Sequence, residues 1–140
     1  MDGWIFYQSH FYYISSRKMN WYDSRKYCTD RRADLIIINN RDEHNFFKKM
    51  SCGAHVWIGL TDRHVEGRWK WVDGSNIGFR SWAVTEPNNI GGNEDCALTH
   101  SFGCIPNAIL AFCHRHWLTS SKRAKVGRHP RLAVKRWEVV

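Results

Sequence analysis

Residues 56–60, VWIGL, are a compact apolar run that separates two differently patterned parts of the chain. Its length and its content of β-branched and aromatic residues predict a buried strand. Two helix-start signals lie before this run. After residue 54 the sequence contains short apolar runs, turn residues and long polar stretches. The pattern therefore predicts two helices in the first fifty residues, followed by strands and loops.

The first predicted helix begins in NWYDSRKYC, residues 20–28. Asn20 is a typical N-cap residue, and Asp23 lies in the first turn, where a negative charge stabilises the helix N-terminus. Trp21, Ser24 and Cys28 fall on one face of a helix that runs to about residue 32.

The second predicted helix begins at a similar signal. Asn40 is its cap and Glu43 reaches back, as in a capping box. The helix runs to about residue 49, with Phe46 and Phe47 in the core. Strands are predicted at residues 4–15, 35–38 and 68–72, and the last of these alternates so that its two tryptophans share one face.

The charge distribution marks a boundary near residue 113. Residues 1–113 contain 13 Lys and Arg against 12 Asp and Glu, whereas residues 114–140 contain 8 against a single acid. We expect one domain over residues 1–113 and a disordered basic tail over residues 114–140. The tail is expected to have no specific nucleic-acid partner, although a phosphate-binding arm with strong salt dependence is an alternative.

An oxygen-rich stretch follows the strands. EPNNIGGNEDC, residues 86–96, holds three acids and three asparagines in a segment whose Pro and Gly residues indicate a loop. It belongs to about 25 residues without a regular pattern, and such a region in a small domain is usually functional. Carboxylate and amide oxygens are the ligands that Ca²⁺ prefers.

Six motifs in order resemble the C-type lectin-like domain. The match extends from residue 3 to about residue 98 and is closest to the mannose-binding, dendritic-cell-lectin-like (DC-SIGN-like) receptors, in particular fish members. The motifs are NWYDSRKYC (20–28), ADLIIINNRDEH (33–44), WIGL (57–60), EGRWKWVDGS (66–75), EPN (86–88) and EDC (94–96).

The resemblance implies an α+β fold with two helices, antiparallel sheets and a long calcium-binding loop region. It also implies Ca²⁺-dependent binding of glycans at Glu86, Asn88 and Glu94, which would hold both the ion and the sugar. The Glu-Pro-Asn order resembles the version that selects equatorial 3- and 4-hydroxyls, as in mannose, N-acetylglucosamine and fucose. A Gln-Pro-Asp order would have suggested galactose.

The family uses further positions for an auxiliary Ca²⁺. The matching residues here are Asp62, Glu66, Asn89 and Asp95. On spacing alone, a solvated acidic loop is the better interpretation of Asp62 and Glu66. The resemblance reverses that preference, and we expect a second calcium site.

The five cysteines leave at least one unpaired within a monomer. The resemblance implies that Cys28 pairs with Cys113 and Cys96 with Cys104, which leaves Cys52 as either a buried apolar residue or an intermolecular thiol. Disulfides imply an extracellular or cell-surface location.

The sequence departs from the family after residue 98. The Trp-Asn-Asp motif that completes the principal calcium site is missing, and so is the closing Trp-Ile-Cys-Glu strand. Fewer ligands weaken Ca²⁺ binding. The alternative function is therefore a lectin-like domain that binds protein or no sugar. A frame change after about residue 98 would explain the missing motif, the basic tail and the odd cysteine together.

Several functional classes have little support. No run of about 18 apolar residues is present, so we expect no membrane span in this chain, and the acidic start does not resemble a signal peptide. No nucleophile lies in a recognisable setting with a base, so we expect no enzyme. Single-sugar contacts are weak, which makes a homo-oligomer a natural expectation.

Overall fold

The protein is described by a computed structural model, which covers residues 3–51, 54–100, 109–116 and 134–138. Within these residues, no helix combines the length and apolar character needed to cross a bilayer. The elements are β1 (Ile5–Tyr7), β2 (His10–Ile14), α1 (Trp21–Thr29), β3 (Asp34–Leu35), α2 (Arg41–Ser51), β4 (His55–Thr61), β5 (Lys70–Trp71), the 3₁₀ turn η1 (Ile90–Gly92), β6 (Cys96–His100), β7 (Ile109–His116) and β8 (Val134–Glu138).

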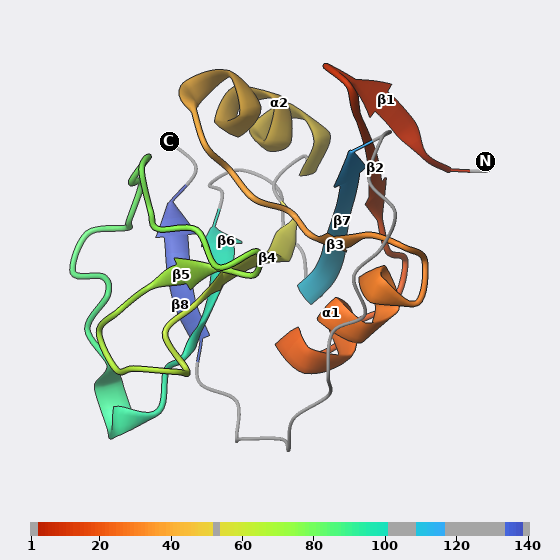
Figure 1. Cartoon of the computed structure of the whole chain (residues 1–140). Helices are drawn as coiled ribbons and strands as arrows, with labels where there is room; N and C mark the ends of the chain where they lie inside the picture. The colour runs from red at the N-terminus through yellow and green to blue at the C-terminus, as the bar shows by residue number, and fades with distance from the viewer. Residues whose placement is uncertain (1–2, 52–53, 101–108, 117–133, 139–140) are drawn as a thin grey trace.

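The strands form a twisted sheet in the order β1-β2-β7-β4-β6-β8, with β3 beside β7 and β5 beside β4. Most pairs are antiparallel, while β4–β7 and β6–β8 are parallel. Figure 1 shows α2 at the top and α1 at the lower right, with strands between them. Two helices on a mainly antiparallel sheet confirm the predicted α+β class.

Helix α1 begins where the cap predicts. The side-chain oxygen of Asn20 accepts a hydrogen bond from Asp23 N at 2.8 Å. The predicted inner face is confirmed, since Trp21, Ser24 and Cys28 are all buried. Trp21 Nε1 also donates to Ile58 O at 2.8 Å, which connects the helix to β4. The helix ends at Thr29, earlier than predicted.

The disulfide between Cys28 and Cys113 joins α1 to β7, as the resemblance implies. Both cysteines are completely buried. Cys96 is a free, buried cysteine, and burial raises the pKa of its thiol to about 12. Because Cys96 is free, the Cys96–Cys104 bridge that the resemblance implies is not formed in this structure. Cys104 itself and Cys52 lie outside the described residues.

Helix α2 has a cap like the one predicted, with one difference. The Asn40 side-chain oxygen accepts from Glu43 N at 2.9 Å, but the Glu43 carboxylate accepts from the N–H of Asn39 at 2.7 Å. Phe47 is fully buried, and Phe46 is partly buried against the core, as expected.

Two predicted strands are shorter in the structure. Of residues 35–38, only Leu35 lies in a strand, while residues 36–38 are buried without being strand. One carbonyl of this segment still bonds to the neighbouring strand β4, since Ile36 O accepts from Gly59 N at 2.9 Å. Strand β5 has two residues, yet Trp69 and Trp71 are both buried, which confirms that they share a face.

The predicted domain boundary differs from the structure. Strand β7 continues beyond residue 113 to His116, and residues of the basic tail form β8, which pairs in parallel with the whole of β6. Figure 1 shows β8 alongside β6 at the edge of the sheet. This part of the tail therefore belongs to the sheet, because the outer edge of β6 offers unpaired backbone groups. Residues 117–133 lie outside the described residues.

Gly59, in the middle of β4, is expected to tolerate no side chain. A Cβ at this position would lie 2.8 Å from Leu35 O and 2.8 Å from Val72 Cγ2. We predict that Gly59→Ala lowers the free energy of unfolding by about 1–3 kcal/mol, because overpacking forces the backbone to shift. Urea unfolding would measure this loss. Gly78→Ala is the matched control, since nothing lies within 4 Å of its Cβ, and equal effects at the two positions would contradict the prediction.

Candidate metal and ligand site

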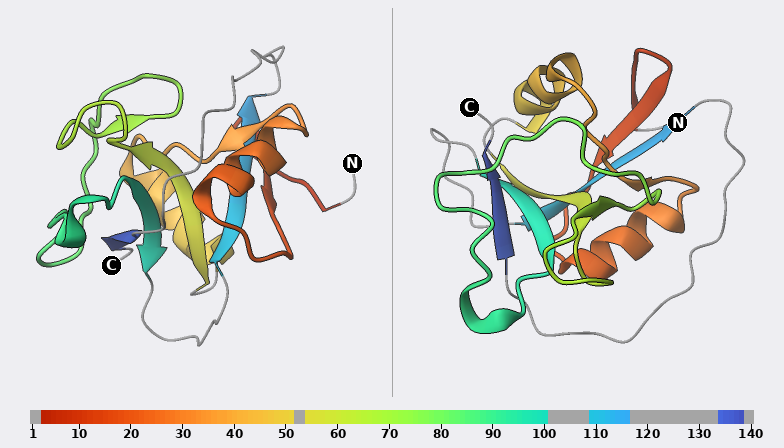
Figure 2. Two further views of the ribbon diagram at one scale, coloured as in Figure 1. Left: turned by 90° about the horizontal axis from the view of Figure 1, so that it is seen from below. Right: turned by 60° about the vertical axis from the view of Figure 1, so that its left-hand side comes forward.

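The candidate site lies in the long segment between β4 and β6, which contains only β5 and η1. Figures 1 and 2 show this segment gathered on the side of the molecule away from β1. Its two ends are held together, since Asp62 N donates to Asp95 O at 3.2 Å and the Thr61 hydroxyl donates to the same oxygen. The pairing of β4 with β6 thus brings residues 33 positions apart into contact.

An acidic cluster forms where these ends meet. Carboxylate oxygens of Asp62, Glu66 and Asp95 all lie within 4.8 Å of one another. Asp62 is 1 % exposed, and one of its oxygens accepts from Gly67 N at 2.9 Å. Three carboxylates this close repel one another unless a cation or a proton compensates them. An all-oxygen set of high charge fits Ca²⁺, so these three residues would hold it.

The second group of predicted residues is held together by hydrogen bonds. Asn88 N and Nδ2 each donate to a carboxylate oxygen of Glu86, both at 3.2 Å. Ile90 N donates both to Asn88 Oδ1, at 3.0 Å, and to Glu94 Oε2, at 3.1 Å. The bond between Glu86 and Pro87 is cis. Asn88 and Glu94 therefore share one backbone donor, and Asn88 is also bonded to Glu86, so the three side chains form one hydrogen-bonded group in the loop.

Asn89 lies between the two groups. Its side-chain oxygen accepts from Glu94 N at 3.1 Å, and its backbone has a left-handed φ of 53°. This contact ties Asn89 to the Glu94 side of the loop. Its assignment to the auxiliary calcium cluster stays a prediction.

A pocket of about 490 Å³ lies beside the Glu86–Pro87 turn. Three cationic side chains line it, along with two tryptophans and Pro87. None of these residues was predicted as part of a site, although the alternation of residues 68–72 indicates where Arg68 and Lys70 point. If Trp69 and Trp71 point inward, Arg68 and Lys70 must point outward. The full lining is Gly67, Arg68, Trp69, Lys70, Asn76, Ile77, Arg80, Trp82 and Pro87.

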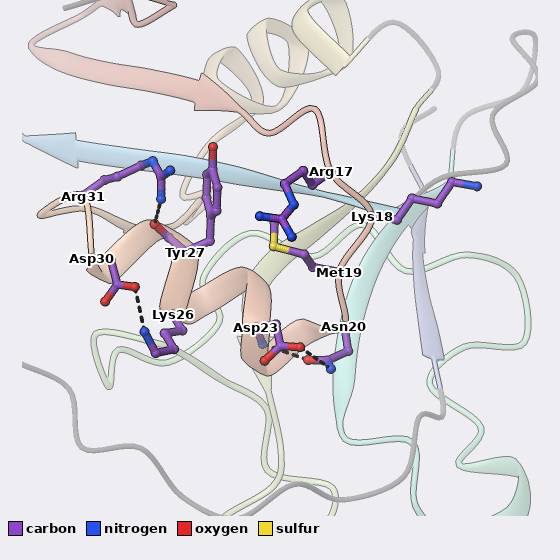
Figure 3. Close-up of a pocket in the computed structure, with 9 residues that line it drawn as sticks. All are labelled: Arg17, Lys18, Met19, Asn20, Asp23, Lys26, Tyr27, Asp30 and Arg31. Atoms are coloured by element: carbon purple, nitrogen blue, oxygen red, sulfur yellow. Dashed lines mark hydrogen bonds and ion pairs between the residues drawn. The ribbon is translucent and has the colours of Figure 1, made fainter.

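A second pocket, of about 550 Å³, lies along α1 (Figure 3). Several of its charged groups already have partners within the pocket. Lys26 and Asp30 form an ion pair at 2.7 Å, and the Arg31 guanidinium lies 3.4 Å from the ring centre of Tyr27. This pocket includes none of the predicted site residues, so the segment between β4 and β6 is the better candidate.

A two-helix α+β domain with an oxygen-rich loop held beside an acidic cluster is the architecture of a lectin-like recognition domain. The family described as "Lectin C-type domain" matches residues 17–108. The chain belongs to this family. The match ends before β7 begins at Ile109, in keeping with the atypical end of the sequence.

Curated relatives and solved structures agree with this assignment. Human "C-type lectin domain family 10 member A" is 38 % identical over 125 residues, which cover 83 % of this chain and 38 % of the relative. Mouse "Asialoglycoprotein receptor 2" is 41 % identical over 108 residues, covering 72 % and 35 %. The chain thus spans about a third of the length of the curated relatives it matches.

Two solved structures resemble the whole domain. The carbohydrate-recognition domain of the mouse scavenger receptor C-type lectin has a TM-score of 0.75 and 31 % identity, over 83 % of this chain and 97 % of that one. The corresponding domain of cow CD23, solved in the presence of a GlcNAc2Man3 oligosaccharide, has a TM-score of 0.73 and 26 % identity, over 85 % and 97 %.

Proposed function

We propose that this domain binds carbohydrate in a calcium-dependent manner through the loop that holds Glu86, Asn88 and Glu94. The observation that supports it is that these three side chains form one hydrogen-bonded group in the loop, with Asn88 bonded to Glu86 and sharing the Ile90 N donor with Glu94. Family membership supports the same conclusion. The function is recognition of a glycan, not catalysis.

The side chains of the loop would contact the sugar directly. The amide NH₂ of Asn88 can donate to a sugar hydroxyl oxygen, and the carboxylates of Glu86 and Glu94 can accept from hydroxyl protons. In the structure the Asn88 amide donates to Glu86, so a hydroxyl would replace that internal bond. Bound Ca²⁺ would supply coordination positions for two neighbouring hydroxyls.

The proposed sugar class rests on the resemblance of Glu86-Pro87-Asn88 to one version of the family's motif. That version goes with sugars that have equatorial 3- and 4-hydroxyls: mannose, N-acetylglucosamine and fucose. The cow CD23 structure with a GlcNAc2Man3 oligosaccharide supports this class. Because some relatives are named as asialoglycoprotein receptors, galactose is the competing sugar class that the binding experiment must test.

The acidic cluster would hold the auxiliary Ca²⁺ and thereby stabilise the loop. Asp62 and Glu66 come from the beginning of the segment, and Asp95 from its end. A cation shared between them would resist separation of the two ends. The buried disulfide supports an extracellular or cell-surface location, because disulfides persist in oxidising compartments. We further propose a homo-oligomer, since several weak sites are needed for avidity.

One observation favours a second candidate, a lectin-like domain that does not bind sugar through calcium. The sequence has no Trp-Asn-Asp motif after Cys96, so the principal site has three side-chain ligands. Ca²⁺ takes about 6–8 oxygens, and fewer protein ligands lower its affinity.

Affinity chromatography distinguishes the two candidates. We expect the folded domain to be retained on mannose–agarose with millimolar Ca²⁺ and released by EDTA. A galactose column, run in parallel, is expected to retain less of the protein.

Glu94→Gln should abolish retention on the mannose column, because it removes a charge from the ion and an acceptor from the sugar. Asp42→Asn, an exposed carboxylate on α2, is the control and should be retained like the wild type. Passage of folded wild-type protein through the mannose column would favour the calcium-independent candidate.

A further inference from the structure

The pocket beside Pro87 carries a concentration of positive charge with no acidic residue in its own lining. Arg68, Lys70 and Arg80 line it, and none of its lining residues is acidic. All three cations are exposed. Among the residues the structure describes, the two ion pairs are Arg25–Asp34 and Lys26–Asp30, so none of the three cations takes part in one.

The backbone explains why these cations lie together. In the alternation that ends at β5, the tryptophans point into the core and Arg68 and Lys70 point outward. A β-bridge between Lys70 and Asn76 closes the turn, so the following loop returns alongside β5 and carries Arg80 to the same pocket. The positions of the cations are therefore set by packing and pairing of the chain.

The floor and wall of the pocket suit a sugar ring. The rings of Trp69 and Trp82 lie 4.9 Å apart, nearly perpendicular to each other. Trp69 is mostly buried, whereas Trp82 is half-buried and contributes to the lining. Ligand sites commonly combine aromatic walls with a few polar or charged groups that fix orientation.

The location of the pocket connects it with the proposed sugar site. Pro87 lies between Glu86 and Asn88, two of the proposed ligands, and it lines the pocket. At the other end Gly67 lines the pocket directly after Glu66 of the acidic cluster. A glycan held at Glu86 and Asn88 would have its substituents or its next residue close to the three cations.

We propose that this pocket is a subsite for an anionic group of the glycan, a sulfate or a carboxylate, carried on or next to the sugar held by the loop. This inference rests on the proposed function. Two guanidinium groups offer planar, paired N–H donors that match sulfate and carboxylate oxygens, and Lys70 adds a third charge. The domain would then select acidic glycans over neutral ones of the same core structure.

The test compares one glycan core in neutral, sulfated and sialylated forms. We expect the wild type to bind at least one acidic form roughly tenfold more tightly than the neutral form at low ionic strength, as hydrogen bonds to charged groups allow. The preference should fall in 0.5 M NaCl because exposed charges are screened. The two acidic forms show whether sulfate or carboxylate is preferred, and equal binding of all three forms would overturn the proposal.

Variants separate the subsite from the proposed sugar site. The triple variant Arg68→Gln, Lys70→Gln, Arg80→Gln should lose the preference for acidic forms and keep the wild-type affinity for the neutral glycan. The charge-matched control Arg41→Gln, Lys48→Gln, Lys49→Gln on α2 should keep the preference. A preference that persists in the first variant would contradict the assignment of these residues.

A last experiment tests the anionic subsite separately, for the case in which the proposed sugar site does not bind. If no neutral glycan binds in Ca²⁺, the proposed function fails, and a sulfated monosaccharide is then titrated in EDTA with tryptophan fluorescence as the readout. Binding that disappears in the pocket variant supports the anionic subsite, and absence of binding by the wild type overturns it.

Discussion

Cys28→Ala is expected to lower the free energy of unfolding by about 4–5 kcal/mol, the largest effect we predict for a single substitution in this protein. The bond to Cys113 spans 85 residues, so the unfolded chain without it gains the conformational freedom of a long loop. Its loss also separates α1 from β7 at a completely buried position. Thermal and urea unfolding of the variant and the wild type measure the difference.

A double-mutant cycle shows whether the cross-link or local packing accounts for the loss. Cys113→Ala and the double variant Cys28→Ala, Cys113→Ala should each cost about as much as Cys28→Ala, because the bond is already absent after one substitution. Costs that add would mean that each cysteine acts through its own packing. In the wild type, reductant should have little effect on the folded protein, since both sulfurs are buried.

Asp62→Asn is expected to remove most of the stabilisation that Ca²⁺ gives to the domain. Binding to the folded state alone stabilises a protein by about 2.7 kcal/mol when the ligand is present at 100 times its dissociation constant. Asp62 is the buried member of the acidic cluster, so its charge is the least screened by solvent. Melting curves with Ca²⁺ and with EDTA should show a large shift for the wild type and a small one for the variant.

The ion-free comparison separates a metal ligand from a structural residue. Without Ca²⁺, Asp62→Asn should be at least as stable as the wild type, because it relieves repulsion from Glu66 and Asp95 and an amide oxygen can still accept from Gly67 N. Asp73→Asn, an exposed acid outside the cluster, should leave the calcium shift unchanged. Equal calcium shifts for Asp62→Asn and the wild type would exclude the cluster as a binding site.

Much of the fold could be predicted because its signals are local. The two caps, Asn20 and Asn40, act within three residues of themselves, and both helices begin where predicted. The alternation around Trp69 and Trp71 predicted which side chains would be buried. Residues 36–38 were predicted as strand from composition alone, but they form an irregular buried segment in which only Ile36 O is shown bonded to β4, and composition cannot distinguish such a segment from a strand.

The candidate site also has parts that the sequence could predict and parts that it could not. Glu86, Asn88 and Glu94 lie within nine residues, and motif order was enough to select them. The acidic cluster required a contact between Asp62 and Asp95 that spacing did not predict, and only the resemblance suggested it. The cationic pocket was missed, because Arg68 and Arg80 have no pattern in the sequence that relates one to the other.

By itself the sequence determined the helices, the buried faces and the family, and it selected the candidate ligand residues of the loop, since caps, periodicity and motif order act over short distances along the chain. Only the tertiary structure decided that β8 of the basic tail pairs with β6, that the two ends of the long segment form one acidic cluster, and that three cations meet beside Pro87. The physical reason is that strand pairing and loop closure join residues far apart in the chain. Their choice of partner depends on which edges and faces the rest of the fold leaves available.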